Sequence, residues 1–175
     1  MSVEARYTPE PSCRSAPNDA IAVVGVGAVG LALARLLRER GEPVVAVAAK
    51  NLEKATEAVR FVGEKVRPCT VEEVPRWANR ILIAVRDDAI AQVAMRLAEA
   101  GLRSGYVLHT SGTQGLEPLA PLRAIGVHCG VLHPLQTLPS AELGLTLLRG
   151  VAFGVGGDSP AREWAREIAQ RLGGR

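Results

Sequence analysis

The sequence predicts an α/β fold in which a doubly wound, mainly parallel sheet of six to seven strands carries helices on both faces. Short runs rich in Val, Ile, Leu and Ala recur along the chain, and stretches with helical periodicity separate them. Such regular alternation is typical of parallel strands connected by helices. The 175 residues are 47% hydrophobic but only 3% aromatic, so we expect one domain with an aliphatic core.

Each expected element has a local signal. The first strand is a continuous apolar run, typical of a strand buried on both faces. The helix after it stops at Gly41, while Asn51 and the pattern Thr70-x-x-Glu73 mark two later helix starts. Strands are expected at 20–27, 43–49, 65–69, 80–85, 105–110, 127–132 and 151–155, and helices at 28–41, 51–59, 70–78, 87–101, 115–124 and 159–172.

Composition excludes several classes of protein. Residues 1–19 show no periodicity and are expected to be a disordered tail before a single domain at 20–175. The net charge of +3 comes from basic residues scattered among Glu on helix faces, so we expect no nucleic-acid partner. Three cysteines without a C-x-x-C pair indicate reduced thiols and a cytoplasmic protein, and the longest early apolar run is too short for a membrane span.

A glycine turn joins the first strand to the first helix: Gly25-Val26-Gly27-Ala28-Val29-Gly30. The G-x-G-x-x-G pattern is weak alone, but here it lies in the strand–turn–helix context that its physics requires. The first glycine permits the tight turn, the second lets a pyrophosphate approach the backbone, and the third lets helix and strand pack closely. A purely structural turn is the alternative, and a dinucleotide site is the favoured interpretation.

The end of the second strand indicates which dinucleotide binds. An Asp or Glu about 20 residues after the glycines usually accepts from the ribose 2′-hydroxyl of NAD. This chain has Lys50 and Asn51 there, and no carboxylate before Glu53. A cation and an amide suit a 2′-phosphate, so we expect NADP as the cofactor; a solvated Lys50 is the alternative.

Polar side chains follow three further strands. Val85 and Arg86 end the fourth strand, where Val85 could wall the nicotinamide and Arg86 could contact the cofactor. His109, Ser111 and His133 end the fifth and sixth strands, and we expect them near the nicotinamide as candidate catalytic hydrogen-bond donors.

Structural roles compete with these. Ser111 could cap the following helix, His133 could hold a turn before Pro134, and Asp87 and Asp88 are expected to cap the helix that they begin. A metal site at His128, Cys129 and His133 is rejected, because adjacent strand residues point to opposite faces.

The glycine turn, "AVRDDAI", "HTSG" and "LHPLQT" together resemble a bacterial family that joins a Rossmann-like NADP-binding domain to a helical C-terminal domain of unknown function 2520. That family is related to pyrroline-5-carboxylate reductase and to deazaflavin-dependent NADP reductase, and more distantly to the 6-phosphogluconate and prephenate dehydrogenases. The resemblance covers residues 20–175. It implies NADP at the glycine turn and at Lys50-Asn51, with the nicotinamide near Val85 and Ser111.

The resemblance also implies a helical domain that completes the active site and a homodimer, and this domain would begin at about residue 175. We therefore expect that the chain is truncated, a fragment or a lone nucleotide-binding module. The favoured function is the cofactor-binding half of an NADP-dependent oxidoreductase that transfers a hydride between NADPH and a small carbonyl or imine compound. The alternative is a non-catalytic NADP-binding or redox-sensing module. A methyltransferase with a similar glycine turn is less favoured, because the other loops would then match by coincidence.

Overall fold

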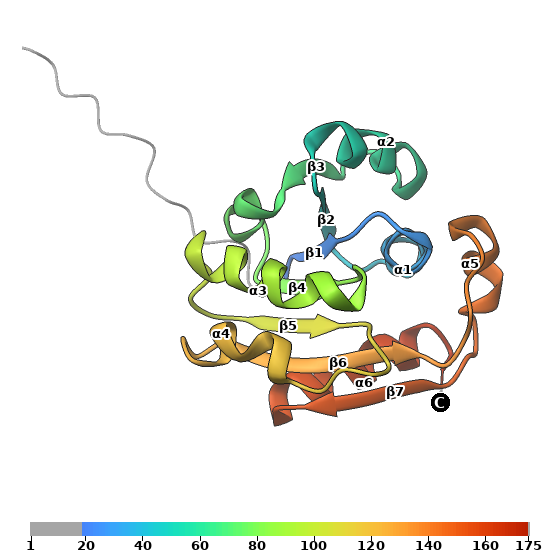
Figure 1. Ribbon diagram of the computed structural model, residues 1–175. Helices are drawn as coiled ribbons and strands as arrows, with labels where there is room; N and C mark the ends of the chain where they lie inside the picture. Colours follow the sequence, from blue (N-terminus) through green and yellow to red (C-terminus); the bar gives the residue numbers. More distant parts are fainter. Residues whose placement is uncertain (1–18, 175) are drawn as a thin grey trace, which may run out of the picture.

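The computed structural model describes residues 19–174, which form one seven-stranded sheet (Figure 1). The strand order is β3-β2-β1-β4-β5-β6-β7; β1 to β6 are parallel, and β7 is antiparallel to β6. The strands are β1 (Ile21–Val24), β2 (Val44–Ala49), β3 (Arg67–Thr70), β4 (Arg80–Ile83), β5 (Tyr106–His109), β6 (His128–Pro134) and β7 (Phe153–Gly157).

Six α-helices and three short 3-10 turns connect the strands of the described chain. The α-helices are α1 (Ala28–Glu39), α2 (Leu52–Val62), α3 (Ile90–Glu99), α4 (Ala120–Arg123), α5 (Ala141–Leu147) and α6 (Ser159–Arg171). The 3-10 turns are η1 (Val71–Arg76), η2 (Asp87–Ala89) and η3 (Glu117–Leu119). No helix within residues 19–174 combines the length and apolarity needed to cross a membrane.

Each face of the sheet has its own apolar core, which confirms the doubly wound prediction. Successive side chains of β1 alternate between the two: Ile21 and Val23 pack with α1, α2 and α6, whereas Ala22 and Val24 pack with η1, α3 and α4. Because both faces of β1 are covered, all its side chains are apolar, which explains the continuous run in the sequence.

Some elements differ from the prediction. Residues 71–76 form a 3-10 turn rather than an α-helix, because Pro75 has no N–H to donate within it. The helix expected at 87–101 starts with the 3-10 turn η2. Residues 1–18, which hold nearly all of the expected tail, lie outside the described residues.

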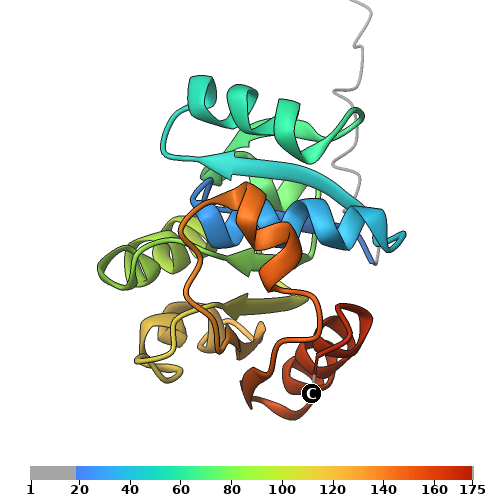
Figure 2. The ribbon, with the colours of Figure 1, turned by 90° about the vertical axis from the view of Figure 1, so that its right-hand side faces the viewer.

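Helix α5 was not predicted. It connects β6 to β7 and lies across α1 (Figure 2). Gly144 of α5 packs against Ala32 of α1: a side-chain carbon at Gly144 would be 2.6 Å from the Ala32 methyl group. The seventh strand was expected, but its antiparallel direction depends on this connection.

Candidate functional site

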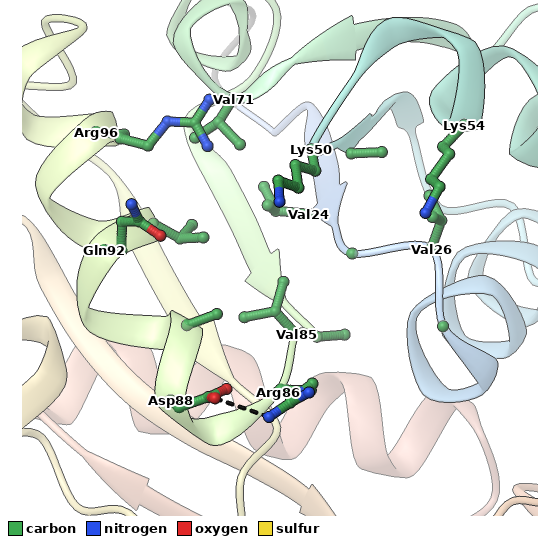
Figure 3. A pocket seen from close by; sticks show the side chains of 16 residues that line it. Val24, Val26, Lys50, Lys54, Val71, Val85, Arg86, Asp88, Gln92 and Arg96 are labelled. Carbon is green, nitrogen blue, oxygen red and sulfur yellow. Dashed lines mark hydrogen bonds and ion pairs between the residues drawn. The ribbon is translucent and has the colours of Figure 1, made fainter.

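A cavity of about 580 Å³ opens where the carboxyl ends of β1, β2 and β4 meet (Figure 3). Strand β1 lies between β2 and β4, so the chain reverses its winding direction beside this cavity. Ligands of open α/β sheets bind at such a switch point. The loops after β1, β2 and β4 line the cavity, and one face of α3 completes it.

The three glycines of the turn have three different environments. Gly25 has a φ of +115°, and a side-chain carbon there would overlap the carbonyl oxygen of Ala84. A side-chain carbon at Gly30 would overlap the carbonyl oxygen of Gly25. At Gly27, by contrast, a side-chain carbon would meet no atom within 4 Å outside its own stretch of chain, so open space faces the backbone there. Two glycines are therefore required by packing, and Gly27 leaves room for a ligand.

Helix α1 begins at this open space. Gly27 is its N-cap residue, no side chain caps the helix, and its first turn contains no acidic residue. The first N–H groups of a helix have no partner within the helix and favour a negatively charged group. Gly25, Val26 and Gly27 line the cavity, whereas Ala28, Val29 and Gly30 belong to the start of α1.

Basic side chains dominate the charge of the cavity. Lys50 follows β2, Lys54 lies in the first turn of α2, and both reach into the cavity (Figure 3). Neither lysine forms an ion pair with residues 19–174. Asn51 is different: its Oδ1 accepts from the Lys54 N–H at 3.0 Å, and it does not line the cavity. Its capping role is confirmed, and Lys54 rather than Asn51 lines the cavity beside Lys50.

The loop after β4 contributes both an apolar and a charged group. Val85 and Arg86 line the cavity, as a contact with the cofactor requires. Arg86 donates to Asp88 at 2.8 Å, although both side chains are largely exposed. Asp87 and Asp88 cap neither η2 nor α3, which corrects that expectation, because their carboxylates bind Thr113 and Arg86 instead.

His109 is fully buried and holds its own loop together. Its Nδ1 accepts from the Ser111 N–H at 3.2 Å, and its Nε2 lies 2.7 Å from the Gly115 carbonyl oxygen, to which it therefore donates. This pair of bonds requires the neutral ring. Burial also lowers the pKa of His109, although the Gly115 contact opposes that shift.

Ser111 is also engaged within its loop. Its Oγ accepts from the N–H groups of Thr113 and Gln114, each at 3.2 Å, and lies 3.3 Å from Thr113 Oγ1. Thr113 Oγ1 in turn donates to Asp87 at 2.6 Å. Contacts with these two hydroxyl groups hold the pKa of Asp87 below its usual value, and the contact with Thr113 has the larger effect. Ser111 does not cap the following helix, since η3 and α4 have no side-chain cap; its Oγ instead closes a turn within its own loop.

His133 joins the two polar loops. Its Nδ1 donates to the Thr110 carbonyl oxygen at 2.9 Å, and its ring fills the space beside Gly112. Its Nε2 has no hydrogen-bond partner within residues 19–174. His109, Ser111 and His133 are therefore brought together, but none of them lines the cavity.

The residues of the metal site that the sequence analysis rejected make other contacts. His128 stacks on Tyr106 with ring centroids 5.7 Å apart, and burial raises the pKa of the Cys129 thiol to about 12. Nowhere in the described chain do three or more His, Cys, Asp or Glu residues gather closely enough to hold a metal ion.

Sequence reasoning missed several cavity residues. Lys54 could have been found, because capping by Asn51 places it in the first helical turn beside β2. Val71, Gln92 and Arg96 have no such signal: they come from η1 and α3, and only the packing of α3 shows which of its faces meets the cavity.

A curated relative and several solved structures are similar to this chain. "Glutamyl-tRNA reductase 2" from Pyrobaculum arsenaticum is 48% identical over 105 residues, which are 60% of this chain and 26% of that protein. The chain thus spans about a quarter of that relative.

Among solved structures, "putative NADP oxidoreductase BF3122" from Bacteroides fragilis has a TM-score of 0.73 at 23% identity, over 89% of this chain and 58% of that one. Aquifex aeolicus prephenate dehydrogenase, solved with hydroxyphenyl propionate and NAD+, has a TM-score of 0.75 at 17% identity, and the match covers 93% of this chain and 60% of that one. A pyrroline-5-carboxylate reductase from Coxiella burnetii has a TM-score of 0.63 at 17% identity, and the match covers 90% of this chain and 57% of that one. The chain spans under two thirds of each, and at these identities the likeness shows the fold.

The model of a Rossmann-like domain matches residues 8–134, which include the glycine turn, the strand with Lys50 at its end and the whole lining of the cavity. More than half of the chain lies within this match, and the strand order agrees with it. The chain therefore belongs to the Rossmann-like domain family.

Proposed function

We propose that this chain binds NADP in the cavity and serves as the cofactor-binding part of an oxidoreductase. The observation that carries the proposal is the pair Lys50 and Lys54, which face the cavity without an ion-pair partner among residues 19–174. A lysine neutralises a phosphate as a point charge. The cavity has one carboxylate in its lining, that of Asp88, which is paired with Arg86.

The residues present fit such a dinucleotide. The open space at Gly27 and the uncapped start of α1 suit its pyrophosphate. Lys50 and Lys54 would hold the 2′-phosphate, and Val26 and Val85 provide apolar walls. When bound, NADPH would supply a hydride, and we propose a small carbonyl or imine compound as its acceptor; two solved structures of similar fold are named imine reductases.

The protein's own part in such a reaction is to hold the acceptor and supply a proton. His109 is held neutral by bonds at both ring nitrogens, and the Ser111 oxygen accepts two N–H groups. Nε2 of His133 is bound to nothing within residues 19–174, so His133 is the acid–base group that we favour among the three. Because Nδ1 donates to Thr110, Nε2 accepts in the neutral ring and donates only when the ring is doubly protonated.

Cofactor preference tests the proposal. Lys50→Ala should weaken NADPH binding by roughly ten- to a hundredfold, because a charge-assisted contact is worth about 1.5–3 kcal/mol. NADH binding should hardly change. Arg60→Ala is the matched control, since it removes one exposed cation from α2 outside the cavity. Equal affinity of the unmutated chain for NADH and NADPH would contradict the proposal.

A second candidate is a non-catalytic NADP-binding or redox-sensing module. The observation in its favour is that no candidate proton donor lines the cavity. NADPH oxidation that depends on a small imine or carbonyl, and that His133→Gln abolishes, would support the enzyme. Tight NADPH binding without such turnover would support the module. The C-terminal helical domain, the homodimer, the absence of a nucleic-acid partner and the cytoplasmic location stay predictions.

A further inference from the structure

The orientation of the His133 ring is set by a loop that follows another strand. Nδ1 of this ring donates to the Thr110 carbonyl oxygen at 2.9 Å, and the ring lies against Gly112. Both contacts come from residues 110–113, which follow β5, whereas His133 itself belongs to β6. The position of residues 110–113 therefore determines where the free Nε2 of His133 points.

Asp87 anchors residues 110–113 from the other side. The Thr113 Oγ1 donates to Asp87 Oδ2 at 2.6 Å, although 26 residues of sequence separate the two. Asp87 begins η2, directly after Val85 and Arg86, which line the cavity, whereas Asp87 itself does not line it. The bond between Asp87 and Thr113 thus joins the loop that holds His133 to the segment that walls the cavity.

The hydrogen bonds at this anchor have a fixed direction. The hydroxyl groups bonded to Asp87, that of Thr113 above all, hold the pKa of its carboxyl below its usual value, so Asp87 is charged at neutral pH. A carboxylate only accepts hydrogen bonds, so the Thr113 hydroxyl donates its proton to Asp87. Ser111 Oγ lies 3.3 Å from Thr113 Oγ1 and is therefore the donor in that contact. A bond to a charged acceptor is about twice as strong as a neutral one, which makes Asp87 an effective anchor.

We propose that Asp87 is a positioning residue for the acid–base group His133: through Thr113 it holds residues 110–113 and so directs Nε2 toward the substrate. The inference rests on the proposed function and deepens it. Reaction rates depend steeply on how the proton-transferring group is aligned, and such a group keeps one geometry only when the residues that support it are themselves held. Because Asp87 directly follows Val85 and Arg86, one short segment sets the position of His133 relative to the cofactor.

The tautomer of the His133 ring tests this role. Nitrogen NMR of the 175-residue chain with ¹⁵N-labelled histidine distinguishes Nδ1–H from Nε2–H, and His128→Gln and His133→Gln assign the signals of the three histidines. In the unmutated chain the proton of the neutral His133 ring lies on Nδ1, as its bond to Thr110 requires. Asp87→Ala should lower the ratio of Nδ1–H to Nε2–H about three- to tenfold, which is the ratio that one net hydrogen bond supports.

Variants of Thr113 separate the hydrogen bond from the shape of the loop. Thr113→Val keeps the size of the side chain but removes the hydroxyl, so it should change the tautomer ratio as much as Asp87→Ala does. Thr113→Ser keeps the hydroxyl and should retain the ratio of the unmutated chain. The double variant should be no worse than either single one, because both remove the same bond. Glu99→Ala, which removes an exposed carboxylate at the end of α3, is the control.

This proposal and the proposed function fail in different measurements. A tautomer ratio that Asp87→Ala changes by less than about twofold overturns the positioning role, whatever the affinity for NADPH. An equal change in Glu99→Ala also overturns it, because the effect would then be a general one of lost charge. In calorimetry, Asp87→Ala should keep the NADPH affinity within about twofold, since Asp87 lies outside the cavity lining. If the unmutated chain binds no NADPH, the proposed function fails, and with it the role of His133 that Asp87 supports.

Discussion

The cavity and the polar loops after β5 and β6 use similar residues in opposite ways. At the cavity, Gly27 faces open space, and Lys50 has no ion-pair partner within residues 19–174. In the loops, the ring of His133 fills the space beside Gly112, and both ring nitrogens of His109 are hydrogen-bonded. Both regions look like sites in sequence, yet the cavity leaves space and two lysines for a ligand, whereas the loops leave Nε2 of His133 without a partner within residues 19–174.

This difference teaches how to interpret polar residues beside glycines. A side chain whose hydrogen bonds are all made within the protein stabilises a loop, since a ligand would have to break those bonds first. A charged side chain without a protein partner, next to a cavity, has its interaction capacity left for a ligand. Gly27 in the glycine turn faces open space, whereas His109 and Ser111 make hydrogen bonds within their own loop.

The sharpest test of the comparison lies within the glycine turn. Gly30→Val should destabilise the fold by about 3 kcal/mol, because its side chain would overlap the Gly25 carbonyl oxygen. Gly27→Val should change stability by less than about 1 kcal/mol, yet weaken NADPH binding more than about a hundredfold, because its side chain occupies the open space. Chemical denaturation and calorimetry measure the two effects.

The pair Gly27→Val and Gly30→Val controls for side-chain size, since both add the same three carbons. Retained NADPH binding in Gly27→Val would show that no pyrophosphate approaches the turn. A stability loss at Gly27 as large as that at Gly30 would mean that the space seen at Gly27 is not available to a side chain.

A smaller effect is expected in the polar loops. Gly112→Ala should lower the free energy of unfolding by about 1–2 kcal/mol, because the new methyl group would meet the ring of His133. NADPH affinity should change by less than about twofold, since these loops lie outside the cavity lining. Thermal unfolding and cofactor titration of one variant give both values. A large loss of NADPH affinity would instead show that these loops contribute to the cofactor site.

The smallest effect is a pH dependence of stability. Burial lowers the pKa of His109 in the folded state, so folding favours its neutral form. This contribution is complete above the unfolded pKa of about 6.5 and is lost as pH falls toward the folded pKa. The slope for one proton is at most about 1.4 kcal/mol per pH unit.

His109→Gln should therefore flatten the loss of unfolding free energy below about pH 6.5. Denaturant titrations on both sides of that pH measure it, and His128→Gln, a change at an exposed ring, serves as the control. An unchanged slope in His109→Gln would place the titrating group elsewhere.

Much of this molecule follows from local sequence. The glycine turn is recognisable because its requirements are local: a positive φ at Gly25 and a missing side chain at Gly30 concern neighbouring backbone. The strands follow from apolar runs, because a strand covered on both faces can carry few polar side chains. Lys50 could be placed beside the turn, since its position depends only on where β2 ends.

The tertiary structure decided which polar groups remain available to a ligand. Thr113 reaches Asp87 across 26 residues, and His133 reaches Thr110 across 23. Arg96 and Gln92 face the cavity because α3 packs its buried side against β4 and β5, and the sequence allowed any exposed face of that helix to do so. The direction of β7 depended likewise on α5 packing against α1. Contacts between distant segments determine which polar groups are hydrogen-bonded and how each helix is oriented. A periodic sequence pattern indicates only that a side chain is buried, and not which residues it contacts.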